Sequence, residues 1–125
     1  MISVALQESG EMYLETIYVL GKANPHVRSV DISEHMGYSK PSVSRAVHLL
    51  KENGYIEMDA DGFITLTCGG RAVAEKIFER HTVISGMLIR LGVDPETAAD
   101  DACRIEHAIS DASFEAIKRH MESLG

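Results

Sequence analysis

The run MGYSKPSVSRAVHLLKENGYI, in the first half of the chain, constrains the fold more than any other segment. Its apolar spacing predicts a helix over about residues 40–53, and a short helix over about residues 31–36 is expected before it, separated by a tight turn at Gly37. Ser39 suits the N-cap of the second helix, and Pro41 suits its first turn, where a missing backbone N–H has no intrahelical partner to lose. Two helices joined in this way predict a helix-turn-helix.

Two short strand-like runs, YIEM and FITL, follow directly and flank DADG, whose Asp and Gly residues favour a hairpin turn. A helix over about residues 11–22, with Ser9 as its N-cap, is expected to precede the helix pair. A helix, a helix pair and a hairpin in this order predict a winged helix-turn-helix domain, for which we expect the bounds 1–70. The expected fold class is therefore mainly α with a small β-hairpin wing.

The remaining residues, 71–125, predict a second domain made of helices. We expect a long helix over about 69–91, a helix that begins at Pro95 with Asp94 as its N-cap, and a last helix from about Ala112. The apolar seam expected on the long helix consists of Val73, Ile77, Ile84, Leu88 and Leu91, with His81 among them.

The net charge of −7 argues against a nucleic-acid partner only until its distribution is considered. Residues 26–51 contain four Lys/Arg against two Asp/Glu, whereas residues 92–125 contain eight Asp/Glu against three Lys/Arg. The basic segment and the acidic segment are therefore different parts of the chain. Such a polarity fits a protein that meets phosphates with one part and cations with the other.

The second helix of the pair would present a polar face, because Val43, Val47 and Leu50 form its apolar stripe. A helix of this kind fits the major groove, where Arg45 can reach guanine edges, while hydroxyls and backbone N–H groups at the helix start hold phosphates. An ordinary helical hairpin with a solvated face is the alternative. The DNA-contacting residues expected from this interpretation are Arg28, Ser39, Lys40, Pro41, Ser42, Ser44 and Arg45.

The segment DDACRIEHAISD places three residue types that bind metals on one helix edge. Cys103, Glu106 and His107 are spaced i, i+3 and i+4, so their side chains stack on one side of a helix and could grip a single cation. The alternative is that Cys103 is a small core residue and the other two are solvated. Met12 and Glu15, spaced i and i+3, are weaker candidates by themselves.

The whole chain, from EMYLETIYVL through the predicted wing to DDACRIEHAISD, resembles the metal-dependent transcriptional regulators of the DtxR/MntR family. In that family a helix-turn-helix domain precedes a helical dimerisation domain, and divalent metal bound between them permits DNA binding. Four positions match the ligand pattern of the iron-responsive branch, and two more fall where the manganese-responsive branch also has ligands. The ligands implied by the resemblance are Met12, Cys103, Glu106 and His107, joined by Glu15 and His81.

The resemblance also implies a repressor of metal-homeostasis genes, with the metal as corepressor rather than catalyst. A homodimer on near-palindromic double-stranded DNA is the expected assembly. The sulfur atoms of Met12 and Cys103 favour Fe(II) over Mn(II), whereas Glu15 offers a hard oxygen that suits Mn(II). Fe(II) is therefore the expected cofactor, and Mn(II) is the alternative.

Two departures from the family pattern change these expectations. Ser85 and Ala99 stand where the iron-responsive branch has Glu and His ligands of a separate ancillary site, so that site is not expected in this form. The chain stops at Gly125, and we therefore expect a short form without the C-terminal SH3-like domain.

A cytoplasmic location is expected from three features of the sequence. No apolar run reaches the length of a membrane span, and no basic segment followed by an apolar one opens the chain. Cys68 and Cys103 show no disulfide-scaffold spacing, which favours reduced thiols in a reducing compartment.

Two other functions compete with the regulator. One is a small metal hydrolase in which Glu106 acts as general base beside a metal-bound water, but the sequence offers no dedicated substrate cleft, so we do not expect an enzyme. The other is a metal-independent winged-helix regulator that responds to a small ligand. Metal titration of DNA binding separates these alternatives, because only the expected regulator loses sequence-specific binding when metal is removed.

Overall fold

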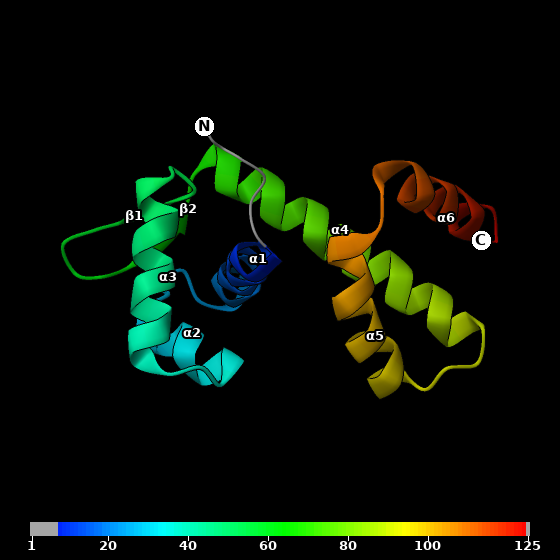
Figure 1. Cartoon of the computed structure of the whole chain (residues 1–125), viewed down its shortest axis with the longest axis horizontal. Coiled ribbons are helices and arrows are strands. Elements are labelled where there is room, and N and C mark those ends of the chain that lie inside the picture. The colour runs from blue at the N-terminus through cyan, green and yellow to red at the C-terminus, as the bar shows by residue number, and fades with distance from the viewer. Residues whose placement is uncertain (1–7, 125) are drawn as a thin grey trace. The chain divides into compact units, whose positions relative to one another are not determined.

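The computed structural model of the chain describes residues 8–124, and its elements follow the expected order (Figure 1). The contacts divide the chain into an N-terminal unit, Met1–Glu75, and a C-terminal unit, Lys76–Gly125. The elements are α1 (Glu8–Ala23), α2 (Ser29–Met36), α3 (Lys40–Glu52), β1 (Ile56–Met58), β2 (Ile64–Leu66), α4 (Cys68–Arg90), α5 (Pro95–Ala108) and α6 (Asp111–Ser123). The expected fold class, mainly α with a small hairpin wing, is confirmed.

The start of α1 differs from the expectation. The helix begins at Glu8, so Ser9 lies within its first turn and is not the N-cap. A serine is a frequent cap but is also tolerated within a helix. Tyr13 and Ile17 are buried as the apolar spacing predicts.

The turn and capping residues of the helix pair lie where the sequence predicts them. α2 ends at Gly37, which adopts the left-handed conformation with φ 73°. α3 begins after Ser39, whose Oγ accepts a hydrogen bond of 3.3 Å from the backbone N–H of Ser42, and Pro41 lies in the first turn. These local signals position α3 directly after a tight turn, as a helix-turn-helix requires.

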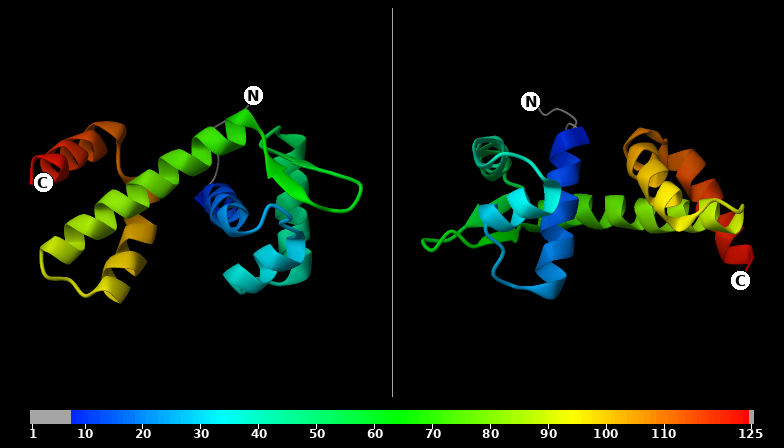
Figure 2. Two further views of the ribbon diagram at one scale, coloured as in Figure 1. Left: turned by 180° about the vertical axis from the view of Figure 1, so that it is seen from behind. Right: turned by 90° about the horizontal axis from the view of Figure 1, so that it is seen from below.

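β1 and β2 form an antiparallel hairpin in which Ile56 pairs with Leu66. The backbone N–H of Ile64 also donates a 2.7 Å hydrogen bond to the carbonyl oxygen of Val27, which ties the hairpin to the segment between α1 and α2. Gly62 supplies the positive φ of 84° that the turn requires. The hairpin projects beyond the helices of its unit (Figures 1 and 2), and is the predicted wing.

The core of the N-terminal unit lies among α1, α2, α3 and the hairpin, and it reaches the first turns of α4. Gly70 marks the closest approach, because a Cβ at this position would lie 1.9 Å from the carbonyl oxygen of Tyr55. Only glycine lets the start of α4 pack so near the hairpin. The buried apolar residues of this core are Tyr13, Leu14, Ile17, Val27, Ile32, Val43, Val47, Leu50, Ile56, Ile64 and Ala74.

The C-terminal unit packs α4, α5 and α6 around a smaller core of Ile84, Ala102 and Phe114. The expected seam of α4 is wrong at Leu91, whose exposed fraction is 74%, because α4 ends at Arg90 and Leu91 follows it. Among residues 8–124, none of the helices combines the length and apolar character needed to cross a lipid bilayer.

Candidate functional site

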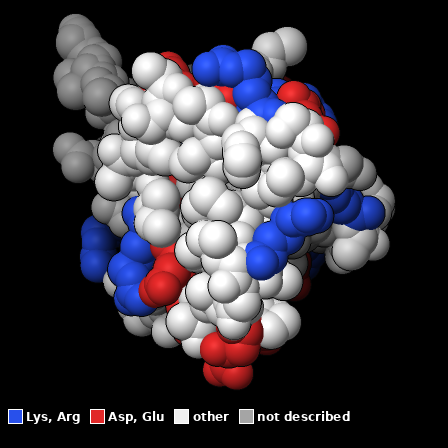
Figure 3. Space-filling model, turned by 90° about the vertical axis from the view of Figure 1, so that its right-hand side faces the viewer, with Lys and Arg blue, Asp and Glu red and all other residues white. Residues whose placement is uncertain are grey.

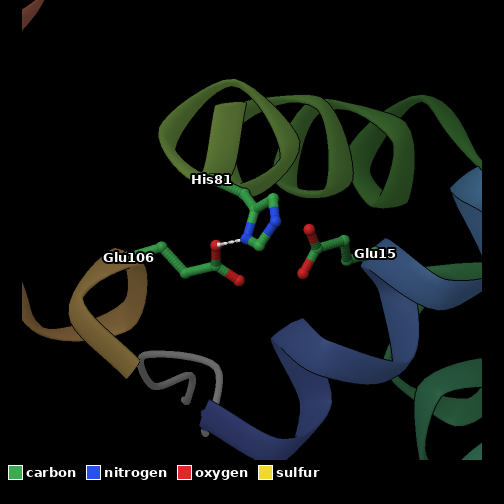
Figure 4. A group of neighbouring side chains, drawn as sticks. All are labelled: Glu15, His81 and Glu106. Atoms are coloured by element: carbon green, nitrogen blue, oxygen red, sulfur yellow. Dashed lines mark hydrogen bonds and ion pairs between the residues drawn. The ribbon is translucent and has the colours of Figure 1, made fainter. Parts of the chain in front are cut away.

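Glu106 is a fully buried carboxylate on α5, with an exposed fraction of 0%. Its Oε2 lies 2.9 Å from Nδ1 of His81 on α4, and Figure 4 marks this contact with a dashed line. Its Oε1 lies 3.4 Å from Nε2 of His107 on α5. Burial of a carboxylate is costly unless the group is paired, and here both oxygens face imidazole nitrogens. Three residues of metal-ligand type therefore converge within the C-terminal unit.

The alternative in which the acidic edge of α5 is merely solvated is wrong for two of its residues. The side chain of His107 is 1% exposed and that of Glu106 is 0% exposed. Cys103 is half-buried and precedes Glu106 by three residues on the same helix, so the predicted spacing on one edge is present. Cys103 forms no disulfide.

The remaining predicted ligands lie on other elements. Met12 and Glu15 are half-buried on α1, in the N-terminal unit. They are spaced i and i+3, which places both on one side of α1. Their participation in a metal site stays a prediction.

The donor types of the C-terminal unit fit a divalent transition metal. Imidazole nitrogen suits Fe, Zn, Cu and Ni, and a carboxylate also suits Mn(II). Glu106 is fully buried between the buried imidazole of His107 and the partly exposed imidazole of His81, so the arrangement is specified by the fold rather than by a surface coincidence. His81 and Glu106 come from α4 and α5, which makes their separation sensitive to how these two helices pack.

Sequence reasoning missed Arg80, which the structure places beside this site. The guanidinium of Arg80 is buried, with a residue exposure of 5%, and its partners belong to the junction between α5 and α6. The spacing of the apolar residues on α4 could have identified it, because position 80 lies on the same helix face as the buried residues Ile77 and Ile84. The seam therefore runs through Arg80, while the side chain of His81 is 30% exposed at its edge.

The exposed face of α3 is the candidate DNA-binding surface. Val43, Val47 and Leu50 are buried, and Ser44 and Arg45 on the other side of the helix are exposed. This is the orientation that the apolar stripe predicted. Ser44 and Arg45 are therefore accessible to a partner, and their contact with a DNA groove stays a prediction.

Polar groups at the start of α3 are joined by hydrogen bonds. Ser39 Oγ donates to Ser42 Oγ at 2.9 Å, and Arg45 Nη2 donates to the same hydroxyl at 3.4 Å. Lys40 and Pro41 are exposed in the first turn. This helix start combines a cation, hydroxyls and the positive end of a helix dipole, which together suit phosphate oxygens.

Arg28 lies at the base of the wing. Its guanidinium carbon is 4.5 Å from the centroid of the Phe63 ring, and the ring of His26 lies 4.6 Å from the same centroid. The phenyl ring therefore restrains a cation next to the hairpin. The expected DNA contacts of Arg28 and of the residues at the start of α3 stay predictions.

Comparison with known proteins places the two halves of the chain in one family. Residues 5–62 match the family described as "Iron dependent repressor, N-terminal DNA binding domain". Residues 67–124 match "Iron dependent repressor, metal binding and dimerisation domain". The two matches follow one another along the chain in the order that the resemblance predicted.

Individual relatives agree with the family matches. The chain is 34% identical to an HTH-type transcriptional regulator of Methanocaldococcus jannaschii. The alignment spans 119 residues and covers 94% of this chain and 95% of the relative. It is 33% identical to the transcriptional regulator MntR of Escherichia coli O6:H1, in an alignment of 113 residues that covers 90% of this chain and 73% of the relative.

A solved structure extends the similarity to the fold. The structure of the manganese regulator SloR matches with a TM-score of 0.81 and 26% identity, over 90% of this chain and 53% of that one. The chain thus spans about half the length of this structural relative. These similarities are to transcriptional regulators and not to enzymes. The chain belongs to the iron-dependent repressor family, the DtxR/MntR family of metal-dependent transcriptional regulators.

Proposed function

We propose that this chain represses metal-homeostasis genes by binding double-stranded DNA when Fe(II) is bound, with Mn(II) as the alternative corepressor. The observation that carries the proposal is the buried Glu106 carboxylate between the nitrogens of His81 and His107. A carboxylate and two imidazoles inside a protein form a donor set for a divalent cation. The family of metal-dependent regulators supports the same assignment.

The proposed ligand set draws on both units. His81, Glu106 and His107 supply nitrogen and oxygen donors from the C-terminal unit, and Cys103 adds a thiolate from the same edge of α5. Met12 and Glu15 complete the set from α1. A divalent cation supplies the positive charge that lets these donors share one centre. Two sulfur donors make the set softer than an all-oxygen one, which supports Fe(II), whereas the Glu15 carboxylate supports Mn(II).

The proposed DNA contacts lie on α3 and beside the wing, in a domain with the bounds 1–70. Arg45 reads a base edge in the major groove, because it is the guanidinium on the exposed face of α3. Lys40 and Arg28 contact phosphates, aided by Ser39, Ser42, Ser44 and the backbone at Pro41. These contacts fix the register of the helix on the duplex.

We propose a homodimer formed by the domain with the bounds 71–125. Three large apolar side chains of the C-terminal unit are solvent-exposed in the single chain: Ile89 and Leu124 at 45% and Leu91 at 74%. Figure 3 shows a broad uncharged area bordered by Lys, Arg, Asp and Glu. Pairing two chains would bury apolar surface and present two α3 helices to a near-palindromic site. Sedimentation showing a strict monomer at micromolar concentration with Fe(II) present would contradict this assembly.

Metal binding would act on DNA binding through a shift between conformations. Ligands from both units are satisfied together only in one relative arrangement of the units, so that arrangement has the higher metal affinity. Metal binding therefore shifts the population of the protein toward this arrangement. The size of the shift is set by the difference in metal affinity between the arrangements. Repression then requires that the favoured arrangement is also the one that presents α3 to DNA.

The test is metal-dependent DNA binding measured without oxygen. Duplexes are selected from a random-sequence library with Fe(II) present, and the affinity for the selected duplex is compared with Fe(II), Mn(II), Zn(II) and a strong chelator. Activation is the readout, because affinity alone follows the Irving–Williams order whatever the physiological metal is. Fe(II) should give the tightest specific binding and the chelator should abolish it. Specific binding that survives the chelator would instead indicate a metal-independent regulator.

A further inference from the structure

Arg80 is a buried cation of the C-terminal unit that the proposed metal chemistry does not use. Its side chain is 6% exposed on α4, and it packs with its guanidinium carbon 5.4 Å from the centroid of the Phe114 ring. A buried guanidinium is costly unless hydrogen bonds and an opposite charge compensate it. The partners of Arg80 therefore indicate what the residue does.

The first partners are main-chain carbonyls at the end of α5. Nη1 of Arg80 donates to the carbonyl oxygen of Glu106 at 3.1 Å and to that of Ile109 at 2.7 Å. α5 ends at Ala108, so the carbonyl of Glu106 belongs to the last turn, where carbonyls lack helical N–H partners. Arg80 thus caps the turn of α5 that carries the two adjacent proposed ligands, Glu106 and His107.

The second partner is the first residue of α6. Nη2 of Arg80 donates to Oδ1 of Asp111, and the same oxygen also accepts from Nζ of Lys76 at 3.1 Å. Hydrogen bonding and charge from Lys76, followed by the charge of Arg80, lower the pKa of Asp111 below its usual value. Asp111 therefore remains ionised and holds the guanidinium at the α5–α6 junction.

We infer that Arg80 is a positioning residue that sets the distance between His81 and Glu106. His81 is its neighbour on α4, and the Glu106 main chain is its hydrogen-bond partner on α5, so one guanidinium fixes both sides of the 2.9 Å contact. The planar fork is essential, because one nitrogen reaches the carbonyls while the other reaches Asp111. The inference rests on the proposed metal-binding function and adds a residue that does not itself bind the cation.

Arg80→Lys is the informative variant, because lysine keeps the positive charge but offers one terminal nitrogen in place of the two terminal nitrogens of the guanidinium. Lys76→Met is the matched control, because it removes the other cation from Asp111 and leaves the carbonyl contacts in place. Arg80→Met leaves the carbonyl oxygens of Glu106 and Ile109 without this donor and can fail to fold. For this variant, only the thermal unfolding of the metal-free protein is measured. Metal binding by the full-length chain is followed by the visible absorption of Co(II), which reports both affinity and ligand geometry.

Arg80→Lys should bind Co(II) about tenfold more weakly than the parent, the lower end of effects seen when groups behind metal ligands are altered. Its absorption bands should also shift, which a general loss of stability would not produce. Lys76→Met should match the parent in affinity and spectrum. Parent-like affinity and spectrum for Arg80→Lys would overturn the inference alone, whereas a parent protein that binds no Co(II) would overturn the proposed function and the inference with it.

Discussion

Nδ1 of His81 lies 2.9 Å from Oε2 of Glu106, and this contact joins α4 to α5 inside the C-terminal unit. Because Glu106 is fully buried, solvent screens its carboxylate little. Donors that are already in place lose less conformational entropy when a ligand binds. The packing of two helices therefore partly preorganises the proposed site.

Base recognition should depend on Arg45. Arg45→Ala should weaken binding to the selected duplex by about 1–3 kcal/mol and relax the preference at one base position. Lys40→Ala should weaken all duplexes alike and reduce the slope of log affinity against log salt by about one. Fluorescence anisotropy over a salt series and a set of single-base variants measures both effects. An unchanged base preference in Arg45→Ala would show that the recognition surface is elsewhere.

Metal selectivity should depend on the two sulfur donors. Replacing Met12 by Asp and Cys103 by Glu together should shift activation of DNA binding toward Mn(II), because hard oxygens replace both soft atoms while Glu106 and His107 remain. The measurement is the ratio of DNA affinities with Fe(II) and with Mn(II). If the double variant keeps the ratio of the parent, the sulfur atoms do not set selectivity and the preference for Fe(II) loses its basis.

Stability should distinguish two adjacent glycines at the start of α4. Gly70→Ala should lower the free energy of unfolding by about 3 kcal/mol or abolish folding, because its Cβ would lie 1.9 Å from the Tyr55 carbonyl oxygen. Gly69→Ala is the control, since its Cβ would meet only Thr67 Oγ1 at 3.8 Å. It should stabilise the protein by about 0.5–1 kcal/mol, as alanine does in a helix. Urea unfolding of both variants provides the comparison, and equal stabilities would contradict the close packing.

Stability at low pH should depend on Asp111. Lys76 and then Arg80 lower its pKa in the folded protein, so its contribution to stability is present above the unfolded pKa of about 4 and is lost as pH falls through the folded pKa. Asp111→Asn should therefore lower Tm at pH 7, and its difference from the parent should shrink toward pH 3. Thermal unfolding of metal-free protein across this range tests the prediction. A difference that is constant with pH would show that the carboxylate is not the cause.

Local signals in the sequence were sufficient for most of the N-terminal unit. Gly37, Ser39 and Pro41 act through backbone conformation and capping within a few residues, so their effects can be predicted without knowledge of the tertiary structure. The apolar stripe of α3 likewise gave the correct buried face. Ser9 misled the prediction of where α1 begins, because several positions near a helix start satisfy the same capping preference.

Long-range contacts account for what the sequence did not reveal. Spacing placed Cys103, Glu106 and His107 on one edge of a helix, but the burial of Glu106 against His81 depends on the packing of α4 on α5. Arg80 was overlooked because a charged residue on a helix is usually exposed, and its hydrogen-bond partners lie 26 to 31 positions later in the chain. A charged residue at a seam position is the signal that would have identified it.

The most direct test of metal-dependent repression compares the parent with Glu106→Gln in DNA binding, with Fe(II) and with a chelator, in the absence of oxygen. Gln keeps the size of the side chain but removes the charge that pairs with the cation, and Glu96→Gln on the exposed start of α5 serves as control. The account predicts that Fe(II) tightens specific binding by the parent and the control at least about tenfold, and that Glu106→Gln binds the duplex only as weakly as the chelated parent. Fe(II)-stimulated binding of equal strength by Glu106→Gln and the parent would contradict it.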